Sequence, residues 1–180
     1  MPAEGYSLQR MRPVIYPIST IGAGQLSVMA RPSGELDLEA ELRGLRHQSV
    51  EHVVSLLEAD EASDLGLADE GPLCSRLGLG FTGFPITDFD IPTRREDAIE
   101  LVETLYGEIF SGAHVVIHCR AGIGRTGLIA CALLVRDGLS PGEAMHKASF
   151  ARGAPMPITG EQVEWVESLK GIVLSKWGPR

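Results

Sequence analysis

HVVIHCRAGIGRTGLIACALLVR, residues 114–136, is the most informative stretch of the chain. His114 to His118 is a short β-branched run that predicts a buried strand, and Ile123 to Arg136 predicts an apolar helix. Gly122 and Gly124 lie in the connection, where the missing Cβ atoms allow the backbone to turn tightly. A strand that passes directly into a helix is typical of a parallel sheet covered by helices.

The segments upstream and downstream continue this alternation. We expect strands at 14–18 and 25–30, joined by a turn at 22–24, and two further strands at 50–57 and 79–86. Helices are expected at 36–48, from Thr93 to Gly112, from Pro141, and from a cap at Thr159 to about Lys176, whereas 58–76 is expected to be a loop. This order predicts an α/β three-layer sandwich with a central, mainly parallel sheet of about four to five strands flanked by helices. Such sheets bind ligands beyond the carboxyl ends of their strands, where the loop after His118 would lie.

Three of the expected helices begin with a recognisable cap. The caps are Thr93 with Glu96, Ser140 with Pro141 at the first helical position, and Thr159 with Gln162. In a capping box each side chain satisfies a backbone N–H that the helix leaves unpaired, so these residues predict where the helices start.

The composition is that of a folded, acidic protein. The 180 residues include 16 Lys and Arg against 24 Asp and Glu, which gives a net charge of −8. This balance argues against general nucleic-acid binding, which requires a basic surface. Three cysteines are too few for a disulfide framework, and no uncharged apolar run approaches the ~18 residues of a membrane span. We therefore expect a cytoplasmic protein with a leader and short N-terminal segment over 1–24 and a single domain over 25–176.

Cys119 and Arg125 give the central stretch its chemistry. The strand delivers Cys119 to the start of a tight loop that runs into a helix N-terminus, where amide groups and the helix dipole favour an anion. A thiol at such a position ionises more readily than a free thiol. Arg125 follows six positions later and can return a planar, bidentate guanidinium to the same point. This convergence predicts attack by the thiolate at the phosphorus of a phosphate monoester.

Three other interpretations of the loop fit less well. A nucleotide-binding P-loop requires a glycine in place of Cys119 and a lysine in place of Arg125. Residues 122–127 satisfy G-x-G-x-x-G, but the next strand and acidic residue of a dinucleotide site are missing, because residues 140–141 begin another helix. A merely structural cysteine would leave Arg125 and the loop glycines unexplained. The histidines show no spacing typical of a metal site, and we expect neither a metal nor another cofactor.

The order His-Cys, five residues, Arg-Thr, with glycines at the third and fifth intervening positions, resembles the cysteine-dependent protein tyrosine phosphatase superfamily. The sequence H-C-R-A-G-I-G-R-T-G is most similar to its small dual-specificity branch, and the resemblance covers residues 25–175. It implies a phosphate monoester hydrolase that acts through a cysteinyl-phosphate intermediate. The implied substrate is phosphotyrosine in a protein, together with phosphoserine or phosphothreonine, and 25–176 would be the phosphatase domain of a monomer.

The resemblance also assigns roles to individual residues. Cys119 would be the nucleophile, Arg125 would bind the phosphoryl oxygens, and Thr126 would donate its hydroxyl to the thiolate. His118 would orient the loop and favour the thiolate. Backbone amides would cradle the phosphate along a loop that consists of Arg120, Ala121, Gly122, Ile123, Gly124 and Arg125.

A general acid is implied on a loop upstream of the cysteine, where the family has an aspartate. Asp88 lies 31 residues before Cys119, and its context Pro-Ile-x-Asp is similar to the family's pattern, which favours it over Asp90. Asp90 is better explained as a turn or cap residue. Gln162 lies where many family members have a glutamine that positions the hydrolytic water, and its place in a capping box explains it equally well.

Other functions were weighed against this interpretation. A small-molecule or inositol-phosphate phosphatase is the alternative, although Ile123 replaces the lysine common in such family members. A phospho-binding module without turnover is disfavoured by the complete set of reactive residues, and a rhodanese-like sulfur-transfer enzyme by the residues that flank Cys119.

Cys131 is expected in the core, and a disulfide between Cys74 and Cys119 is a less favoured hypothesis.

Overall fold

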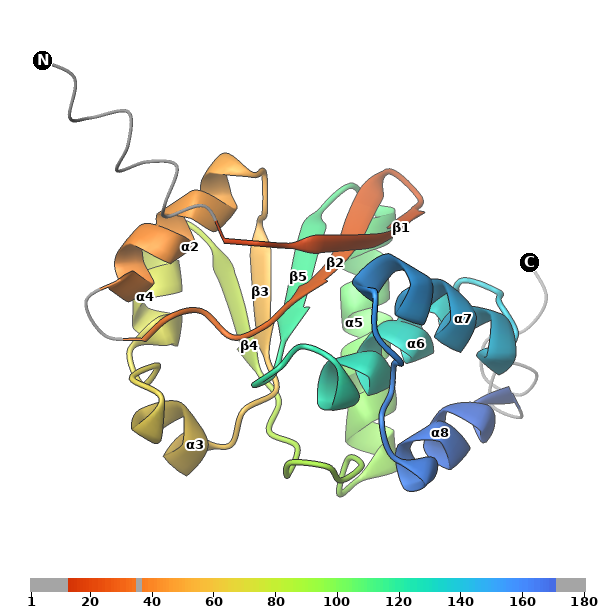
Figure 1. Ribbon diagram of the computed structural model, residues 1–180. Coiled ribbons are helices and arrows are strands. Elements are labelled where there is room, and N and C mark those ends of the chain that lie inside the picture. The colour runs from red at the N-terminus through yellow and green to blue at the C-terminus, as the bar shows by residue number, and fades with distance from the viewer. Residues whose placement is uncertain (1–12, 35–36, 171–180) are drawn as a thin grey trace, which may run out of the picture.

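One sheet of five strands, in the order β1-β2-β5-β3-β4, forms the centre of the protein. The computed structural model describes residues 13–34 and 37–170 (Figure 1). The strands are β1 (Tyr16–Ile21), β2 (Gly24–Met29), β3 (His52–Ser55), β4 (Gly80–Gly83) and β5 (His114–His118). Only the β1–β2 hairpin pair is antiparallel, and the other neighbours run parallel. The predicted, mainly parallel sheet is confirmed.

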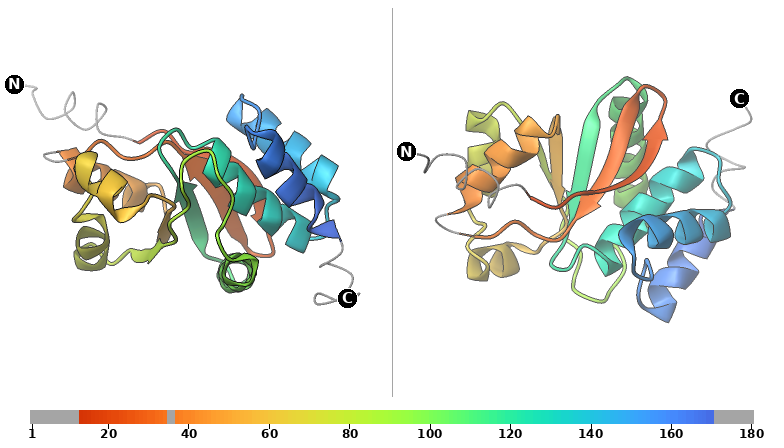
Figure 2. Two further views of the ribbon diagram at one scale, coloured as in Figure 1. Left: turned by 90° about the horizontal axis from the view of Figure 1, so that it is seen from below. Right: turned by 45° about the horizontal axis from the view of Figure 1, so that its top comes forward.

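Seven helices of the described residues lie on the two faces of this sheet. They are α2 (Leu38–His47), α3 (Ala59–Asp64), α4 (Glu70–Arg76), α5 (Arg95–Phe110), α6 (Gly124–Arg136), α7 (Pro141–Arg152) and α8 (Gly160–Glu167). One buried cluster joins the sheet to α5–α8 and another joins it to α2 and α4. Figures 1 and 2 show these two groups of helices on opposite sides of the sheet, so the three-layer α/β sandwich is confirmed.

The position of β5 follows from its residues. Val115 and Ile117 pack into the cluster beneath α5–α8, and Val116 packs into the cluster beneath α2 and α4. Each of these side chains is fully buried, as expected for a parallel strand with a neighbour on both sides and helices on both faces. The run His114–His118 therefore delivers Cys119 to the centre of the sheet at its carboxyl edge.

Helix α6 is the most buried helix of the structure. Every residue from Gly124 to Val135 is buried, because α6 contacts α5, α7, α8 and the sheet. A helix that is apolar on all sides is stable only in such an interior position. Since α6 begins where the loop after Cys119 ends, the loop is anchored to rigid elements at both ends.

The sequence-based prediction was wrong at residues 58–76 and at Thr93. Residues 58–76, expected to be a loop, contain α3 and α4, and the tertiary burial of Leu67, Leu73 and Cys74 stabilises this acidic, glycine-containing segment. The predicted cap at Thr93 is also wrong. Helix α5 starts one residue later than that cap requires, with Arg94 at the N-cap and no side-chain cap hydrogen bond.

The two other predicted caps are confirmed. Ser140 and Thr159 both form complete capping boxes, with Glu143 and Gln162 respectively. Helix α8 ends at Glu167 instead of continuing toward Lys176, and residues 171–176 lie outside the described residues. Of the leader and short N-terminal segment expected over 1–24, residues 1–12 also lie outside them, whereas β1 shows that residues 16–21 belong to the sheet. Across the described ranges, no helix combines the length and apolar character needed to cross a membrane.

Candidate active site

Cys119 lies at the carboxyl edge of the sheet, directly after β5. The strand β5 pairs at this edge with Met29 of β2 and Ser55 of β3, so the ends of three parallel strands meet around Cys119. In Figure 1 this edge is at the bottom of the view, beside α3 and the start of α6. Cys119 is 3% exposed. The structure therefore places the predicted nucleophile where open parallel sheets bind their ligands.

The loop after Cys119 turns its carbonyl groups outward. Each of four successive carbonyl oxygens lies within hydrogen-bond distance of a nitrogen outside the loop, and three of these nitrogens are certain donors, whereas the role of the imidazole nitrogen beside Cys119 depends on its tautomer. The pairs are Cys119 with His118 Nδ1 (3.3 Å), Arg120 with the Arg31 amide (3.2 Å), Ala121 with Arg152 Nη2 (3.0 Å) and Gly122 with Arg152 Nε (3.1 Å). In a trans peptide the next N–H points the opposite way, so the amides of residues 120–123 face the inside of the loop. That arrangement is a concave anion site.

Gly122 is required for this turn. Its φ is +66°, a left-handed conformation that other residues adopt rarely. A Cβ atom at this position would also lie 2.0 Å from the carbonyl oxygen of Met29. The loop can therefore pass close to the end of β2 only with glycine here.

Arg125 is buried in the first turn of α6, with 1% of its surface exposed. Its Nη1 and Nη2 donate to the two carboxylate oxygens of Glu61 at 2.7 and 2.9 Å, and Nη1 also donates to the carbonyl of Ile86 at 3.0 Å. Nη2 lies 3.1 Å from Oδ1 of Asp88. The buried Nε has no partner in the described part of the chain. A buried donor without a partner is costly, and an anion in the loop would satisfy it.

The charge state of Arg125 is set by these neighbours. Burial alone would lower the pKa of Arg125, but the hydrogen bonds to Glu61 and the negative charges of Cys119, Glu61 and Asp88 outweigh it and raise the pKa. In turn, the hydrogen bonds from Arg125 lower the pKa of Glu61 against the opposing effect of burial, and the charges of Arg125 and Arg120 add to this. The arginine and the glutamate therefore form a charged pair near neutral pH.

Glu61 and Glu70 are site residues that the sequence analysis missed. Glu61 lies on α3 and Glu70 lies on α4, both in the segment expected to be a loop. Oε1 of Glu70 lies 2.9 Å from Nε2 of His118, and both side chains are almost completely buried. An acidic segment looks solvated in the sequence, so only its packing against the loop identifies these two residues.

Thr126 and Gln162 also lie close to the loop. Thr126, in the first turn of α6, is fully buried, and its hydroxyl has no partner among the described residues. Gln162 is fully buried, and its Oε1 accepts from the amides of Ile158 and Thr159. Its Nε2 donates to the carbonyl of Asp90 at 3.0 Å, so the capping residue also ties α8 to the loop that contains both aspartates.

The two candidate acids differ in one long-range contact. Each carboxylate accepts the amide of the next residue, Asp88 from Phe89 at 3.1 Å and Asp90 from Ile91 at 2.8 Å. Asp88, with 44% of its side chain exposed, also reaches Arg125. Between the two aspartates, Phe89 has a φ of +62° and is 62% exposed. The structure therefore brings the carboxylate of Asp88 to Arg125, and an exposed aromatic residue follows Asp88 directly in the chain.

The other two cysteines are separate from this site. Burial raises the pKa of Cys131 to about 12, and burial together with the charge of Glu70 raises the pKa of Cys74 to about 12. All three thiols are free. Cys74 and Cys119 belong to different buried clusters, and this separation gives no support to a disulfide between them. Within the described ranges, no cluster of His, Cys, Asp or Glu could hold a metal ion.

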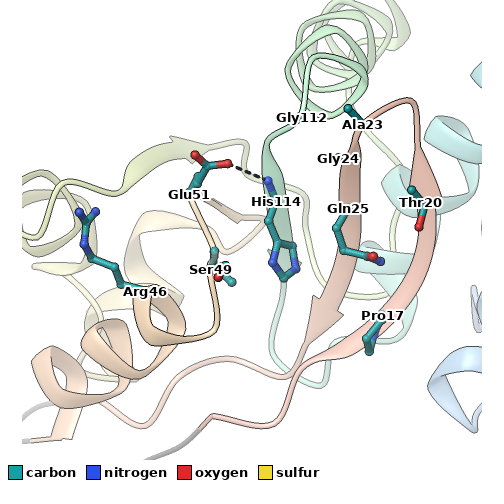
Figure 3. A pocket seen from close by; sticks show the side chains of 11 residues that line it. Pro17, Thr20, Ala23, Gly24, Gln25, Arg46, Ser49, Glu51, Gly112 and His114 are labelled. Carbon is teal, nitrogen blue, oxygen red and sulfur yellow. Dashed lines mark hydrogen bonds between the residues drawn. The ribbon is translucent and has the colours of Figure 1, made fainter.

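A hollow of about 810 Å³ lies at the opposite edge of the sheet (Figure 3). Its polar residues have partners within the fold: His114 Nε2 lies 2.8 Å from Ser27 Oγ, Glu51 accepts the His114 amide, and Arg46 donates to the carbonyl of Gly78. Burial lowers the pKa of His114, so its ring is neutral near neutral pH. These polar side chains, which line the hollow, are therefore occupied by partners of the fold.

A family model described as "Polymorphic toxin system, DSP-PTPase phosphatase" matches residues 27–139, which is more than half of the chain. The chain therefore belongs to this phosphatase family, within the cysteine-dependent protein tyrosine phosphatase superfamily. It is an enzyme that hydrolyses phosphate esters by the mechanism of that superfamily. No curated protein matches the chain.

Solved structures share the fold. The kinase associated phosphatase with serine at its catalytic cysteine has a TM-score of 0.81 and 20% identity, over 91% of this chain and 97% of that one. Tk-PTP in its active form has a TM-score of 0.70 and 26% identity, over 87% and 97%. PTPMT1 in complex with PI(5)P has a TM-score of 0.74 and 18% identity, over 91% and 98%. The first and third likenesses establish the fold alone.

The lowered pKa of Glu61 predicts how the stability of the protein changes in acid. Ionised Glu61 stabilises the folded state fully at pH values above 4.5, the ordinary pKa of a glutamate. This contribution is lost as the pH falls through the lower pKa that Glu61 has in the folded protein. Glu61→Gln should therefore cost about 2 kcal/mol of unfolding free energy near neutral pH and progressively less below about pH 4.5. Denaturant titrations over this pH range would measure the difference.

Asp60→Asn is the matched control, because Asp60 is an exposed carboxylate on the same helix. It should change the free energy of unfolding by less than about 0.5 kcal/mol at every pH. A loss in Glu61→Gln that stays constant down to the lowest pH would contradict the ionic role of the pair.

Proposed function

We propose that Cys119 attacks the phosphorus of a phosphate monoester that is bound in the loop of residues 120–125. The single observation that carries this assignment is the convergence of inward-facing amides with the unpartnered Nε of buried Arg125, beside the thiol at the end of β5. In the first step the P–O bond to the substrate breaks and a P–S bond forms. The product is a cysteinyl-phosphate intermediate, and the loop donors stabilise the charge that develops on the phosphoryl oxygens.

Arg125 would bind the phosphoryl group through Nε and the adjacent Nη2. Glu61 and the carbonyl of Ile86 hold the guanidinium plane before substrate arrives. A preorganised donor of this kind loses little entropy when the anion binds. The Asp88 carboxylate that now touches Nη2 would move toward the leaving oxygen when a phosphate occupies the loop.

Asp88 is the proposed general acid. It would protonate the leaving alkoxide or phenoxide in the first step and take a proton from the attacking water in the second. Water then breaks the P–S bond, and inorganic phosphate leaves. Thr126 would donate its unpartnered hydroxyl to the thiolate as it departs. Gln162 is proposed to position that water with the N–H of its amide that the contact with Asp90 does not use.

The proposed substrate is phosphotyrosine in a protein, with phosphoserine and phosphothreonine as further substrates. Phe89 supports this proposal, because an exposed ring held beside the general acid can pack against an aryl leaving group. Exposed Arg120 can add positive charge at the mouth of the site. We further propose that the phosphatase domain consists of the predicted 25–176 together with the strand β1, and that the protein acts as a cytoplasmic monomer.

Cys119→Ser tests the nucleophile. It should abolish hydrolysis of p-nitrophenyl phosphate, because a serine hydroxyl at this position is not ionised, while binding of inorganic phosphate or vanadate is retained. Wild type and variant are compared in EDTA with a thiol reductant, and EDTA should leave the wild-type rate unchanged. Turnover by the variant would refute the assignment of Cys119. An inactive wild type that still binds vanadate would favour a phospho-binding module.

Asp88→Asn should lower kcat by about 10²–10⁴-fold for aryl phosphates and remove the basic limb of the pH–rate profile. The reason is that the amide cannot protonate the leaving group. Asp90→Asn is the matched control and should keep that limb, since it is Asp88 whose carboxylate reaches Arg125. The assignment is wrong if the two variants exchange these behaviours.

Phe89→Ala tests the substrate class. We expect kcat/KM to fall about tenfold for a phosphotyrosine peptide, and much less for the matching phosphoserine peptide, because only the aryl group can pack on the ring. Phe150→Ala, which removes an exposed ring from α7, serves as control and should change neither value. Equal losses on both peptides would contradict packing against an aryl group, and faster hydrolysis of inositol phosphates than of any peptide would support the small-molecule alternative.

A further inference from the structure

Glu70 is a buried carboxylate that the catalytic scheme does not use. It lies on α4 with 2% of its side chain exposed, and glutamate is almost never buried to this extent without a partner. Its Oε1 lies 2.9 Å from Nε2 of His118, which is completely buried. On the other side of the imidazole, Nδ1 lies 3.3 Å from the carbonyl oxygen of Cys119. The ring of His118 therefore lies between Glu70 and the first carbonyl of the phosphate loop.

Both partners of this imidazole are oxygen acceptors. A neutral imidazole carries one N–H, so it can satisfy only one of them. If that proton were on Nε2, the lone pair of Nδ1 would face the carbonyl of Cys119 and the buried pair would carry a net negative charge. A second proton on the pair removes both problems, either as imidazolium with carboxylate or as neutral imidazole with a protonated carboxyl group. In both forms Nδ1–H donates to the carbonyl of Cys119.

We propose that Glu70 is a positioning residue, which keeps a proton on Nδ1 of His118 and so holds the carbonyl of Cys119 turned out of the phosphate loop. This inference rests on the proposed role of Cys119. Because the peptide plane is rigid, an outward carbonyl at Cys119 turns the amide of Arg120 toward the bound phosphate. In the ionic form, the imidazolium is also closer to Cys119 than the carboxylate is, so the pair favours the thiolate.

The charged and titratable groups around this pair are few. Cys74 faces Glu70 from the next turn of α4, and burial and the charge of Glu70 raise its pKa to about 12, so it stays a neutral thiol. On the loop side are Cys119 and Arg125, and Arg125 is itself paired with Glu61 and Asp88. A change confined to Glu70 therefore reaches Cys119 through His118.

The first measurement uses the unaltered protein. Long-range ¹H–¹⁵N spectra of its histidine rings, near neutral pH, should show Nδ1 of His118 protonated, as donor to Cys119. A His118 ring protonated only at Nε2 would overturn the proposal. This readout does not depend on turnover, so it is independent of whether Cys119 proves to be the nucleophile.

The second measurement compares Glu70→Gln with the wild type by alkylation of Cys119 with iodoacetamide as a function of pH. Glutamine has nearly the same shape as glutamate but no negative charge. The pH of half-maximal alkylation should therefore rise, and the alkylation rate at pH values below it should fall about tenfold. Peptide mapping assigns the modified cysteine. Asp69→Asn is the control. Asp69 directly precedes Glu70, is exposed and makes no cap hydrogen bond with its side chain, so this variant should leave the profile unchanged.

The outcomes separate a positioning role from a structural one. A Glu70→Gln variant that melts earlier but alkylates with the wild-type profile would overturn the proposal, because the pair would then only fasten α4 to the sheet. The same shift in Asp69→Asn would also overturn it, since the effect would belong to net charge alone. If Glu70→Gln does not fold, Glu70→Asp, which keeps the carboxylate, should alkylate within about twofold of wild type, and the ring spectra of the wild type still test the tautomer.

Discussion

The buried guanidinium of Arg125 is the constraint on which the rest of the site depends. A charge that leaves water is stable only if its hydrogen bonds are replaced, and Arg125 obtains them from the carboxylate of Glu61 and the carbonyl of Ile86. These partners lie on α3 and on the segment after β4, so neither is close to Arg125 in the sequence. The remaining Nε donor is left for a ligand.

The backbone of the loop after Cys119 also depends on hydrogen bonds from residues that are distant in the sequence. An anion site made of amides needs every carbonyl of the loop to find a donor elsewhere, since a buried carbonyl without a partner is costly. Arg152 supplies two of these donors from the end of α7, and the amide of Arg31 supplies another from the segment after β2. The helices and strands around the loop therefore help to form the proposed phosphate site by holding its backbone.

The helices α3 and α4 supply side chains to the proposed site as well as packing to the sheet. Helices α3 and α4 are short, and each contributes one carboxylate to the edge of the sheet where Cys119 lies. Glu61 orients the guanidinium, and Glu70 lies behind His118. On the other face, Gln162 connects α8 to the loop that carries Asp88 and Asp90. Both layers thus converge on a loop of a few residues.

The sequence by itself determined the strand β5, the glycine-rich turn, helix α6 and the two later capping boxes, because local hydrophobic pattern and backbone conformation specify them. A short and specific motif also named Cys119 and Arg125 as candidate site residues, and the family resemblance added Asp88 from its context upstream. Only the tertiary structure revealed Glu61, Glu70 and Arg152 as partners of that motif and formed α3 and α4 in an expected loop. The physical reason is that a charged residue in an acidic or polar segment looks solvent-exposed in the sequence. It reaches the site only when segments distant in the sequence pack together, and such packing leaves no periodic pattern in the sequence.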